Sequence, residues 1–314
     1  MFAKKNEVWR GESVTVLSGL GNIDLRDTFE CGQAFRYQMT EDSDEYLEYM
    51  TVVKDKIIRV GQRERGEIII SGMSEDDIDT LIIPYFALDT DFEAIRADVV
   101  NRTDSEWLKR AADSAKGIVI LRQDPWETVF SFIISQNNNI PRIRKIIQAL
   151  AAEYGENLAV RNGILKCPLC KIDGTPCDEK CKSCGICYSF PRAEDVAKRP
   201  DGMLPSRPGF RYKYLLDAAE RVTRGETDLD EIYSHRSYDY TVEQLKKIKG
   251  VGDKVAACAA LFGFGNLEAF PIDVWMRRAI DTYFDGSLDY ISLGEYRGVA
   301  QQYIFHYIRN LENQ

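Results

Sequence analysis

The feature that most constrains the fold of this chain is a change in the spacing of its apolar residues near residue 90. Before it, short stretches such as SVTVLSG, KIIRVGQ and EIIISG are separated by Gly, Asp and Ser turns, which is typical of an antiparallel sheet. From about residue 91, apolar residues recur every three or four positions, as in DPWETVFSFIIS and IPRIRKIIQALAAEYG, and this spacing predicts amphipathic helices. We therefore predict an α+β protein, with a β-rich N-terminal domain over residues 1–90 and a two-part helical body over residues 91–314.

Composition excludes several classes of protein. Of the 314 residues, 44% are hydrophobic and 29% are charged, and no low-complexity tract marks a disordered region. No apolar run approaches the roughly 18 residues of a membrane span, and the first residues lack the apolar core of a signal peptide. We therefore expect a soluble, intracellular protein without membrane association. The net charge of -9 argues only weakly against nucleic-acid binding, because basic groups can gather on one face.

The cysteines are concentrated in one segment that interrupts the helical pattern like an insertion. Six of the eight lie within residues 163–189. Two C-x-x-C pairs there have the spacing of a tetrahedral structural zinc site. These pairs are Cys167 with Cys170 and Cys181 with Cys184, and Cys177 and Cys187 are left over. We interpret the segment first as a zinc site, second as an iron–sulfur site and third as redox-active or free thiols.

Residues 245–264 have the pattern of a helix, a tight turn and a second helix. Gly250 and Gly252 flank Val251, and glycine allows positive φ and the close approach of another backbone. The free amides at the start of the second helix, together with its dipole, suit a phosphate. Asp253 has the position of a helix-start residue. A glycine-rich turn alone is equally consistent with a simple connection between helices.

Two charged residues follow this turn. Lys254 begins an apolar helix, where the helix dipole and partial burial disfavour its ammonium form. A neutral amine there is a nucleophile able to form a Schiff base, but for an isolated lysine a side chain that extends into solvent is the stronger interpretation. Asp273, in FPIDVWMRRAI, is interpreted either as a helix N-cap or as a carboxylate that stabilises positive charge or moves protons.

These stretches together resemble the helix–hairpin–helix DNA glycosylases of base-excision repair. LKKIKGVGDKVA followed by PIDVWMRR is similar to their hairpin, loop and aspartate. FECGQAFRY, SQNNNIPRI, PGFRYKYL and YRGVAQQYIF are similar, in order, to the 8-oxoguanine DNA glycosylase/lyase branch over residues 24–305, with gaps. The resemblance implies a monomeric, bifunctional enzyme that needs no cofactor for catalysis and acts on double-stranded DNA containing 8-oxoguanine.

The resemblance also implies roles for individual residues. Lys254 would attack the sugar C1′ and form the Schiff base, and Asp273 would support charge at the sugar. One departure is Trp275, which stands where better-known relatives have a histidine near the DNA backbone. An indole cannot act as acid or base, so phosphate contact or pH dependence is expected to differ there.

In the implied base pocket, four residues surround the everted base. The backbone carbonyl of Gly32 would accept the N7 hydrogen that 8-oxoguanine has and guanine lacks. Cys258 and Phe305 would sandwich the base, and the carboxamide of Gln301 would bind its Watson–Crick edge. Taken singly, these residues have simpler interpretations as a turn glycine, two core residues and a surface glutamine.

The remaining implied contacts are with DNA. Asn137, Arg142 and Arg211 would bind the orphaned cytosine, and Phe210 would act as an aromatic wedge. The hairpin residues assigned to DNA binding are Lys249, Gly250, Val251 and Gly252. Carbonyls around Lys249 and Val251 would hold a monovalent cation that bridges to a phosphate. A local basic segment, with a merely solvated helix face as its alternative, comprises Arg207, Arg211, Lys213, Arg221 and Arg224.

Two alternative functions are retained. The first is a related glycosylase with a different lesion or opposite-base preference. The second is a non-catalytic, metal-stabilised DNA-binding module that keeps the hairpin. The presence of both Lys254 and Asp273 argues against this second alternative.

Overall fold

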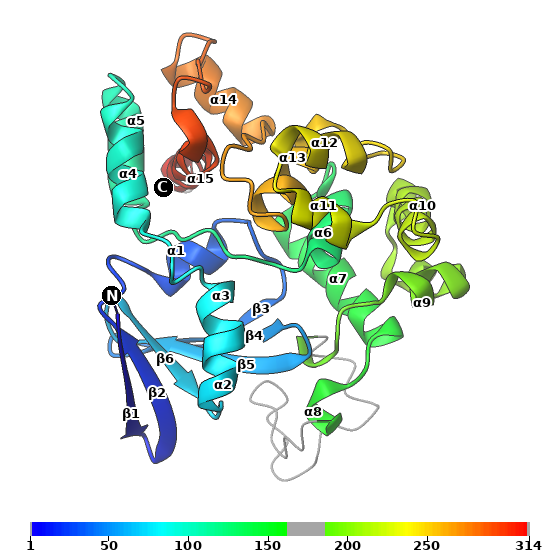
Figure 1. Cartoon of the computed structure of the whole chain (residues 1–314), viewed down its shortest axis with the longest axis horizontal. Helices are drawn as coiled ribbons and strands as arrows, with labels where there is room; N and C mark the ends of the chain where they lie inside the picture. The colour runs from blue at the N-terminus through cyan, green and yellow to red at the C-terminus, as the bar shows by residue number, and fades with distance from the viewer. Residues whose placement is uncertain (1, 162–185, 313–314) are drawn as a thin grey trace.

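The structure is a computed structural model that describes residues 2–161 and 186–312. A sheet formed by the first part of the chain lies against a larger body of helices (Figure 1). The strands are β1 (Ala3–Trp9), β2 (Glu12–Ser18), β3 (Tyr37–Asp42), β4 (Leu47–Val53), β5 (Lys56–Gln62) and β6 (Glu67–Ser71). The predicted α+β class, with an antiparallel N-terminal sheet, is confirmed.

The helices follow the sheet in the chain, except for α1, which lies between β2 and β3. The α-helices are α1 (Leu25–Glu30), α2 (Glu75–Asp77), α3 (Ile83–Tyr85), α4 (Phe92–Asn101), α5 (Glu106–Ser114), α6 (Pro125–Ser135), α7 (Ile140–Tyr154), α8 (Leu158–Arg161), α9 (Ala193–Lys198), α10 (Tyr212–Thr223), α11 (Leu229–His235), α12 (Tyr238–Leu245), α13 (Asp253–Phe262), α14 (Val274–Tyr283) and α15 (Arg297–Glu312). The π-helix is η1 (Ile78–Ile82), and the 3₁₀ helices are η3 (Pro200–Ser206), η4 (Gly209–Arg211) and η5 (Gly294–Tyr296). No helix within the described ranges is both long and apolar enough to cross a membrane.

The sheet has the strand order β1-β2-β6-β5-β4-β3, and every neighbouring pair is antiparallel. Strands β1 and β3 are therefore its two edges. The stretches quoted from the sequence correspond to β2, β5 and β6, whereas β1 was not predicted, and its residues AKKNEVW are mostly exposed. This strand pairs only with β2 and lacks the apolar alternation by which a half-buried strand is recognised.

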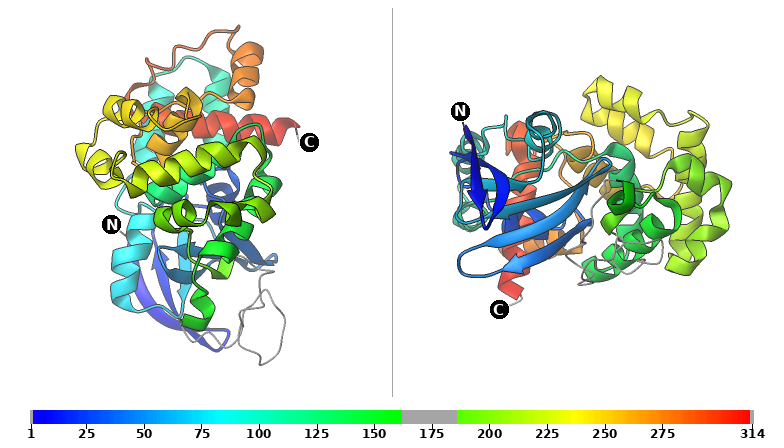
Figure 2. Two further views of the ribbon diagram at one scale, coloured as in Figure 1. Left: turned by 90° about the vertical axis from the view of Figure 1, so that its right-hand side faces the viewer. Right: turned by 90° about the horizontal axis from the view of Figure 1, so that it is seen from below.

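The sheet and the helices have separate apolar cores that meet at one extended segment, 118–121. Its side chains alternate as in a strand. Ile118 and Ile120 belong to the core of the helical body, whereas Val119 and Leu121 belong to the core between the sheet, α1 and η1. Figure 2 shows the sheet against this body from two further sides. The segment therefore joins the two parts of the molecule beside α1.

The segments that flank the cysteine-rich stretch pack on the opposite face of the sheet. Leu158 and Ala159 of α8, together with Ile186 and Cys187, are buried against Met50 and Val52 of β4. The predicted zinc ligands Cys167, Cys170, Cys181 and Cys184 lie outside the described residues. Within the described ranges, no group of three or more His, Cys, Asp and Glu side chains is arranged to hold a metal ion.

Candidate functional site

The glycine turn joins α12 to α13 and packs against α10. Gly250 has φ +80, and a Cβ atom there would lie 2.4 Å from Cγ of the Tyr214 ring, so the turn requires glycine at this position. Gly252 does not use the positive φ that glycine allows. Its φ is −98, a value that any residue can adopt. Gly252 is also the N-cap of α13, a position for which the sequence suggested Asp253. Asp253 is instead the first helical residue and forms an ion pair with Lys246, with Nζ and Oδ1 2.6 Å apart.

Lys254 does not extend into solvent. Its side chain is half-buried, with Nζ 3.2 Å from Oγ of Ser135 and 5.1 Å from the centre of the Phe132 ring. The Ser135 hydroxyl donates to the Phe132 carbonyl over 2.8 Å, which leaves a lone pair of Oγ free to face the amine. The interpretation of Lys254 as an exposed surface lysine is therefore wrong, because the C-terminal end of α6 holds the amine.

Lys254 and Asp273 both lie close enough to Cys258 for their charges to act on its thiol. Cys258 is one helical turn further along α13 and 4% exposed, and burial raises the pKa of its thiol. The positive charge of Lys254 opposes this rise, and the negative charge of Asp273 adds to it. Asp273 is the N-cap of α14, where Oδ1 accepts from the Met276 amide over 2.9 Å. The cap interpretation is thus correct, and among the described residues no donor engages Oδ2.

Gly32 and Phe305 are brought together at the boundary between the sheet and α15. Gly32 has φ +83, and a Cβ atom there would lie 3.3 Å from the Phe305 ring and 3.6 Å from Ile140. Gln301 is buried one turn before Phe305 on α15, where its Oε1 accepts from Nε2 of Gln302 over 2.7 Å. Residues four apart share one helix face, so Gln301 and Phe305 lie on the same side of α15. Phe305 packs against the apolar cluster that contains Cys258.

Gln33 positions this glycine, although it was not among the residues predicted for the site. Its fully buried side chain donates to the carbonyls of Thr28 (2.9 Å) and Val119 (2.8 Å) and accepts from the Leu121 amide (2.9 Å). These bonds fasten the loop after α1 to the segment that joins the two cores. A polar residue inside the otherwise apolar stretch GQAF was the available signal, because a buried carboxamide needs several partners.

Arg211 is directed at backbone carbonyls. It is 2% exposed and donates to the carbonyls of Gln136, Asn137 (2.9 Å) and Pro208 (3.2 Å). Burial and, secondly, the nearby charge of Arg142 lower the pKa of its guanidinium. Asn137 has φ +47, a conformation that asparagine tolerates better than most residues. The structure therefore assigns Arg211 a role in holding the Asn137 turn, and its predicted contact with DNA stays a prediction.

Phe210 is one of the exposed large apolar residues of the described chain, at 48% exposure. Its ring stands edge-on to Tyr214, with centroids 6.1 Å apart, and the Arg211 guanidinium lies 4.5 Å from its centroid. An exposed aromatic ring held from two sides has the properties that an intercalating wedge needs. Trp275, the departure noted in the sequence, contacts Arg278 at 5.2 Å.

Cationic side chains of the sheet form ion pairs with carboxylates, whereas several cationic side chains around α6, α7 and η4 do not. Arg10 pairs with Glu41, and Arg63 pairs with Glu7 and Glu67. Within the described ranges, no ion pair forms at Arg142, Arg144, Lys145, Arg207, Arg211, Lys213 or Lys254. The predicted basic segment is shorter than the sequence suggested, because carboxylates neutralise Arg221 and Arg224.

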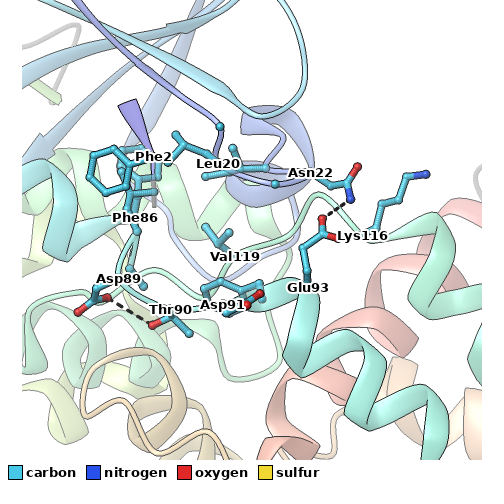
Figure 3. A pocket seen from close by; sticks show the side chains of 16 residues that line it. Phe2, Leu20, Asn22, Phe86, Asp89, Thr90, Asp91, Glu93, Lys116 and Val119 are labelled. Atoms are coloured by element: carbon cyan, nitrogen blue, oxygen red, sulfur yellow. Dashed lines mark hydrogen bonds between the residues drawn. The ribbon is translucent and has the colours of Figure 1, made fainter. Parts of the chain in front are cut away.

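A large cavity lies away from these residues. It has a volume of about 640 Å³ and opens between residues 19–23 and 86–93 (Figure 3). Phe2, Leu20 and Val119 form its apolar wall, and Asn22 bonds Glu93 at its rim. None of the residues predicted for catalysis, base recognition or DNA binding lines it, so size alone does not locate the site in this molecule.

A helix–hairpin–helix beside a half-buried lysine and a capping aspartate defines the class of helix–hairpin–helix DNA glycosylases. Residues 16–129 match the family described as 8-oxoguanine DNA glycosylase, N-terminal domain. The 8-oxoguanine glycosylase/lyase of Clostridium acetobutylicum, solved with DNA containing cytosine opposite 8-oxoguanine, is 30% identical with a TM-score of 0.80, over 99% of this chain and 98% of that one. A protein called MBOgg1, solved with a low-affinity DNA ligand, is 32% identical with a TM-score of 0.80, over 99% of both chains.

A curated relative supports the same assignment. The N-glycosylase/DNA lyase of Saccharomyces cerevisiae is 28% identical over 273 residues, which cover 81% of this chain and 66% of the yeast protein. The present chain therefore belongs to the 8-oxoguanine DNA glycosylase/lyase family.

Proposed function

We propose that this protein is a bifunctional DNA glycosylase/lyase that removes 8-oxoguanine from duplex DNA as a monomer. The observation that carries the proposal is the position of the Lys254 amine, which Ser135 and Phe132 hold beside Cys258, a thiol on which the charge of Asp273 also acts. Family membership places this hairpin in a class of DNA-acting enzymes. The unpaired cations around α6, α7 and η4 supply the phosphate attraction that an acidic chain otherwise lacks.

In the proposed reaction, the neutral Lys254 amine attacks C1′ of the everted nucleotide. The C1′–N9 bond breaks and its electron pair leaves with the base. The amine gives up two protons, one to the departing base and one to the ring oxygen O4′, as the C1′–O4′ bond breaks and the sugar ring opens to a Schiff base. Loss of a C2′ proton then expels the 3′ phosphate by β-elimination. Oδ2 of Asp273 is the oxygen available to stabilise positive charge at the sugar, because Oδ1 is bound to the Met276 amide. The attack requires an amine without its proton.

Base recognition is assigned to the pocket around Gly32. In the described part of the chain, no donor bonds the Gly32 carbonyl, so it is free to accept the N7 hydrogen of 8-oxoguanine. Guanine presents a lone pair at N7, and a lone pair facing a carbonyl oxygen forms no hydrogen bond. Eversion costs roughly a few kcal/mol, so a lost hydrogen bond at this position is enough to change which base stays in the pocket.

The proposal includes two bound ions, a monovalent cation at the hairpin and a structural zinc. Within the described residues, no hydrogen bond reaches the carbonyl oxygens of Lys249 and Val251, which therefore suit the predicted monovalent cation of the hairpin. The four predicted cysteine ligands have the spacing of a structural zinc site. Neither ion takes part in the reaction proposed for Lys254.

The test is base release from synthetic duplexes that differ in one position. We expect release and strand cleavage with 8-oxoguanine opposite cytosine, and little of either with guanine opposite cytosine. Gly32→Ala would distort the carbonyl and is expected to reduce the preference between these two substrates. If a different lesion is released faster than 8-oxoguanine, the alternative of a related glycosylase with another preference replaces this proposal.

A further inference from the structure

A basic groove runs between α7 and the edge strand β3, outside the residues assigned to the lesion. Two cavities of about 590 and 270 Å³ share Gln38, Ile140 and Arg144 and so form one depression, here called the α7–β3 groove. It begins at Ile140, whose side chain would lie 3.6 Å from a Cβ atom added at Gly32, on the side of the predicted base pocket. Along α7 it continues past Lys145 to Gln148, and Arg309 lies at its other end.

We propose that the α7–β3 groove binds the sugar–phosphate backbone of the duplex beyond the lesion. This inference rests on the proposed function, because it extends the surface on which that DNA lies. From Ile140 to Gln148 the helix advances by about 12 Å at 1.5 Å per residue. At about 3.4 Å per base pair, the groove matches roughly four base pairs of flanking duplex.

The charge of the groove favours a polyanion. Arg144, Lys145 and Arg309 line it, and the only acidic residue among its described lining is Glu30 at the Arg309 end. Glu30 accepts a hydrogen bond from the Tyr49 hydroxyl over 2.7 Å. Lys145 is exposed and pairs with no described carboxylate. We therefore expect the DNA phosphates to contact the end of the groove formed by Arg144 and Lys145, away from Glu30.

Arg144 is a fixed cation rather than a mobile one. Its guanidinium lies 4.3 Å from the centre of the Tyr37 ring, and one terminal nitrogen donates to the Tyr37 carbonyl. Its other terminal nitrogen forms no hydrogen bond with a described residue. A guanidinium fixed before binding loses little rotamer freedom when it meets a phosphate.

The same contact argues against a protein strand as the occupant. Strand β3 is an edge of the sheet, and an open edge is otherwise a place where another chain adds a strand. The carbonyl of Tyr37, the first residue of β3, however, already accepts from Arg144. One acceptor that an added strand would need is thus occupied, and the Arg144 side chain stands at that position of the edge.

The experiment compares the DNA affinity of the protein for duplexes of two lengths. All measurements use the Lys254→Gln variant as the parent, because it is expected to bind the lesion without cleaving the DNA. Short duplexes carry about three base pairs on each side of 8-oxoguanine, and long ones extend by about four more on one side or the other. We expect extension on one side alone to raise the affinity of this parent. Lys145→Gln and Ala149→Glu, which change exposed groove residues, are each expected to lose most of that gain.

Salt supplies a second readout. One lost phosphate contact lowers the slope of log affinity against log salt by about 0.9, so the advantage of the parent over Lys145→Gln should shrink about threefold from 50 to 200 mM salt. Lys116→Gln, an exposed lysine outside the groove, serves as the matched control and should keep the length effect. The inference is overturned if both groove variants keep the full gain on extension. Failure of the parent to bind either length would contradict the proposed function instead.

Discussion

Replacement of Arg211 by methionine should destabilise the fold as well as weaken DNA binding. The Arg211 guanidinium donates hydrogen bonds to the carbonyls of Gln136, Asn137 and Pro208. The residue is almost inaccessible to solvent. A buried acceptor that loses its donor costs about 1–3 kcal/mol. If water donates to one of these three carbonyls in the variant, the other two are left without a donor. We therefore expect a loss of about 3 kcal/mol in the free energy of unfolding. For a chain of this size, that loss corresponds to a fall in Tm of about 5 °C.

Thermal unfolding followed by circular dichroism measures this effect. The matched control is Arg221→Met, since Arg221 is a partly exposed arginine paired only with the carboxylates of Asp217 and Glu226. Its loss should cost less than about 1 kcal/mol. Arg211→Lys should behave like Arg211→Met, because a single ammonium cannot reproduce a planar fork that reaches three carbonyls. An unchanged Tm for Arg211→Met would refute the reasoning and leave Arg211 as a DNA contact only.

Three further predictions follow from local geometry. Gly250→Ala should cost about 2 kcal/mol or more and weaken DNA binding, because positive φ and the Tyr214 ring both oppose a Cβ atom; binding at the wild-type level would contradict this. Burial and the charge of Asp24 raise the pKa of Asp27 to about 6. Between about pH 4 and 6 the folded state therefore binds a proton at this carboxyl that the unfolded state has lost. The free energy of unfolding should fall as pH rises through this window, by at most about 3 kcal/mol. Asp27→Asn should therefore gain in Tm relative to wild type at pH 8 but not at pH 4, and a gain independent of pH would refute the assignment. Metal analysis should find roughly one zinc per chain, lost in Cys170→Ser; a metal-free, anaerobically purified wild type would remove the zinc interpretation.

The fold could be predicted largely because its elements are amphipathic in the ordinary way. Strands β4, β5 and β6 have the β-branched composition of half-buried strands. Helix α6 begins at Pro125, directly after an N-cap residue of a preferred type, Asp124, whose side chain accepts from the Glu127 amide. Strand β1 was missed because its stability comes from pairing with β2 rather than from burial. The start of α13 was placed at Asp253 because capping preference was considered without the turn geometry, which assigns the cap to Gly252.

The candidate site was harder to predict where partners lie far apart in the sequence. The neighbourhood of Lys254, Cys258 and Asp273 followed from one recognisable motif. The partners of the lysine amine did not, because Ser135 and Phe132 lie on α6, more than a hundred residues earlier. Gln33 and Arg211 likewise act through backbone carbonyls, which carry no sequence signature at the acceptor end.

The proposed function depends on attack by the amine of Lys254 on the sugar of an everted nucleotide. The direct measurement is borohydride trapping on a duplex with 8-oxoguanine opposite cytosine, using wild type, Lys254→Gln and the control Lys116→Gln. We expect a covalent protein–DNA adduct for wild type and Lys116→Gln and none for Lys254→Gln, with lesion binding retained in all three. A trapped adduct that persists in Lys254→Gln would contradict the role of Lys254, as would a wild type that binds the lesion but yields no adduct.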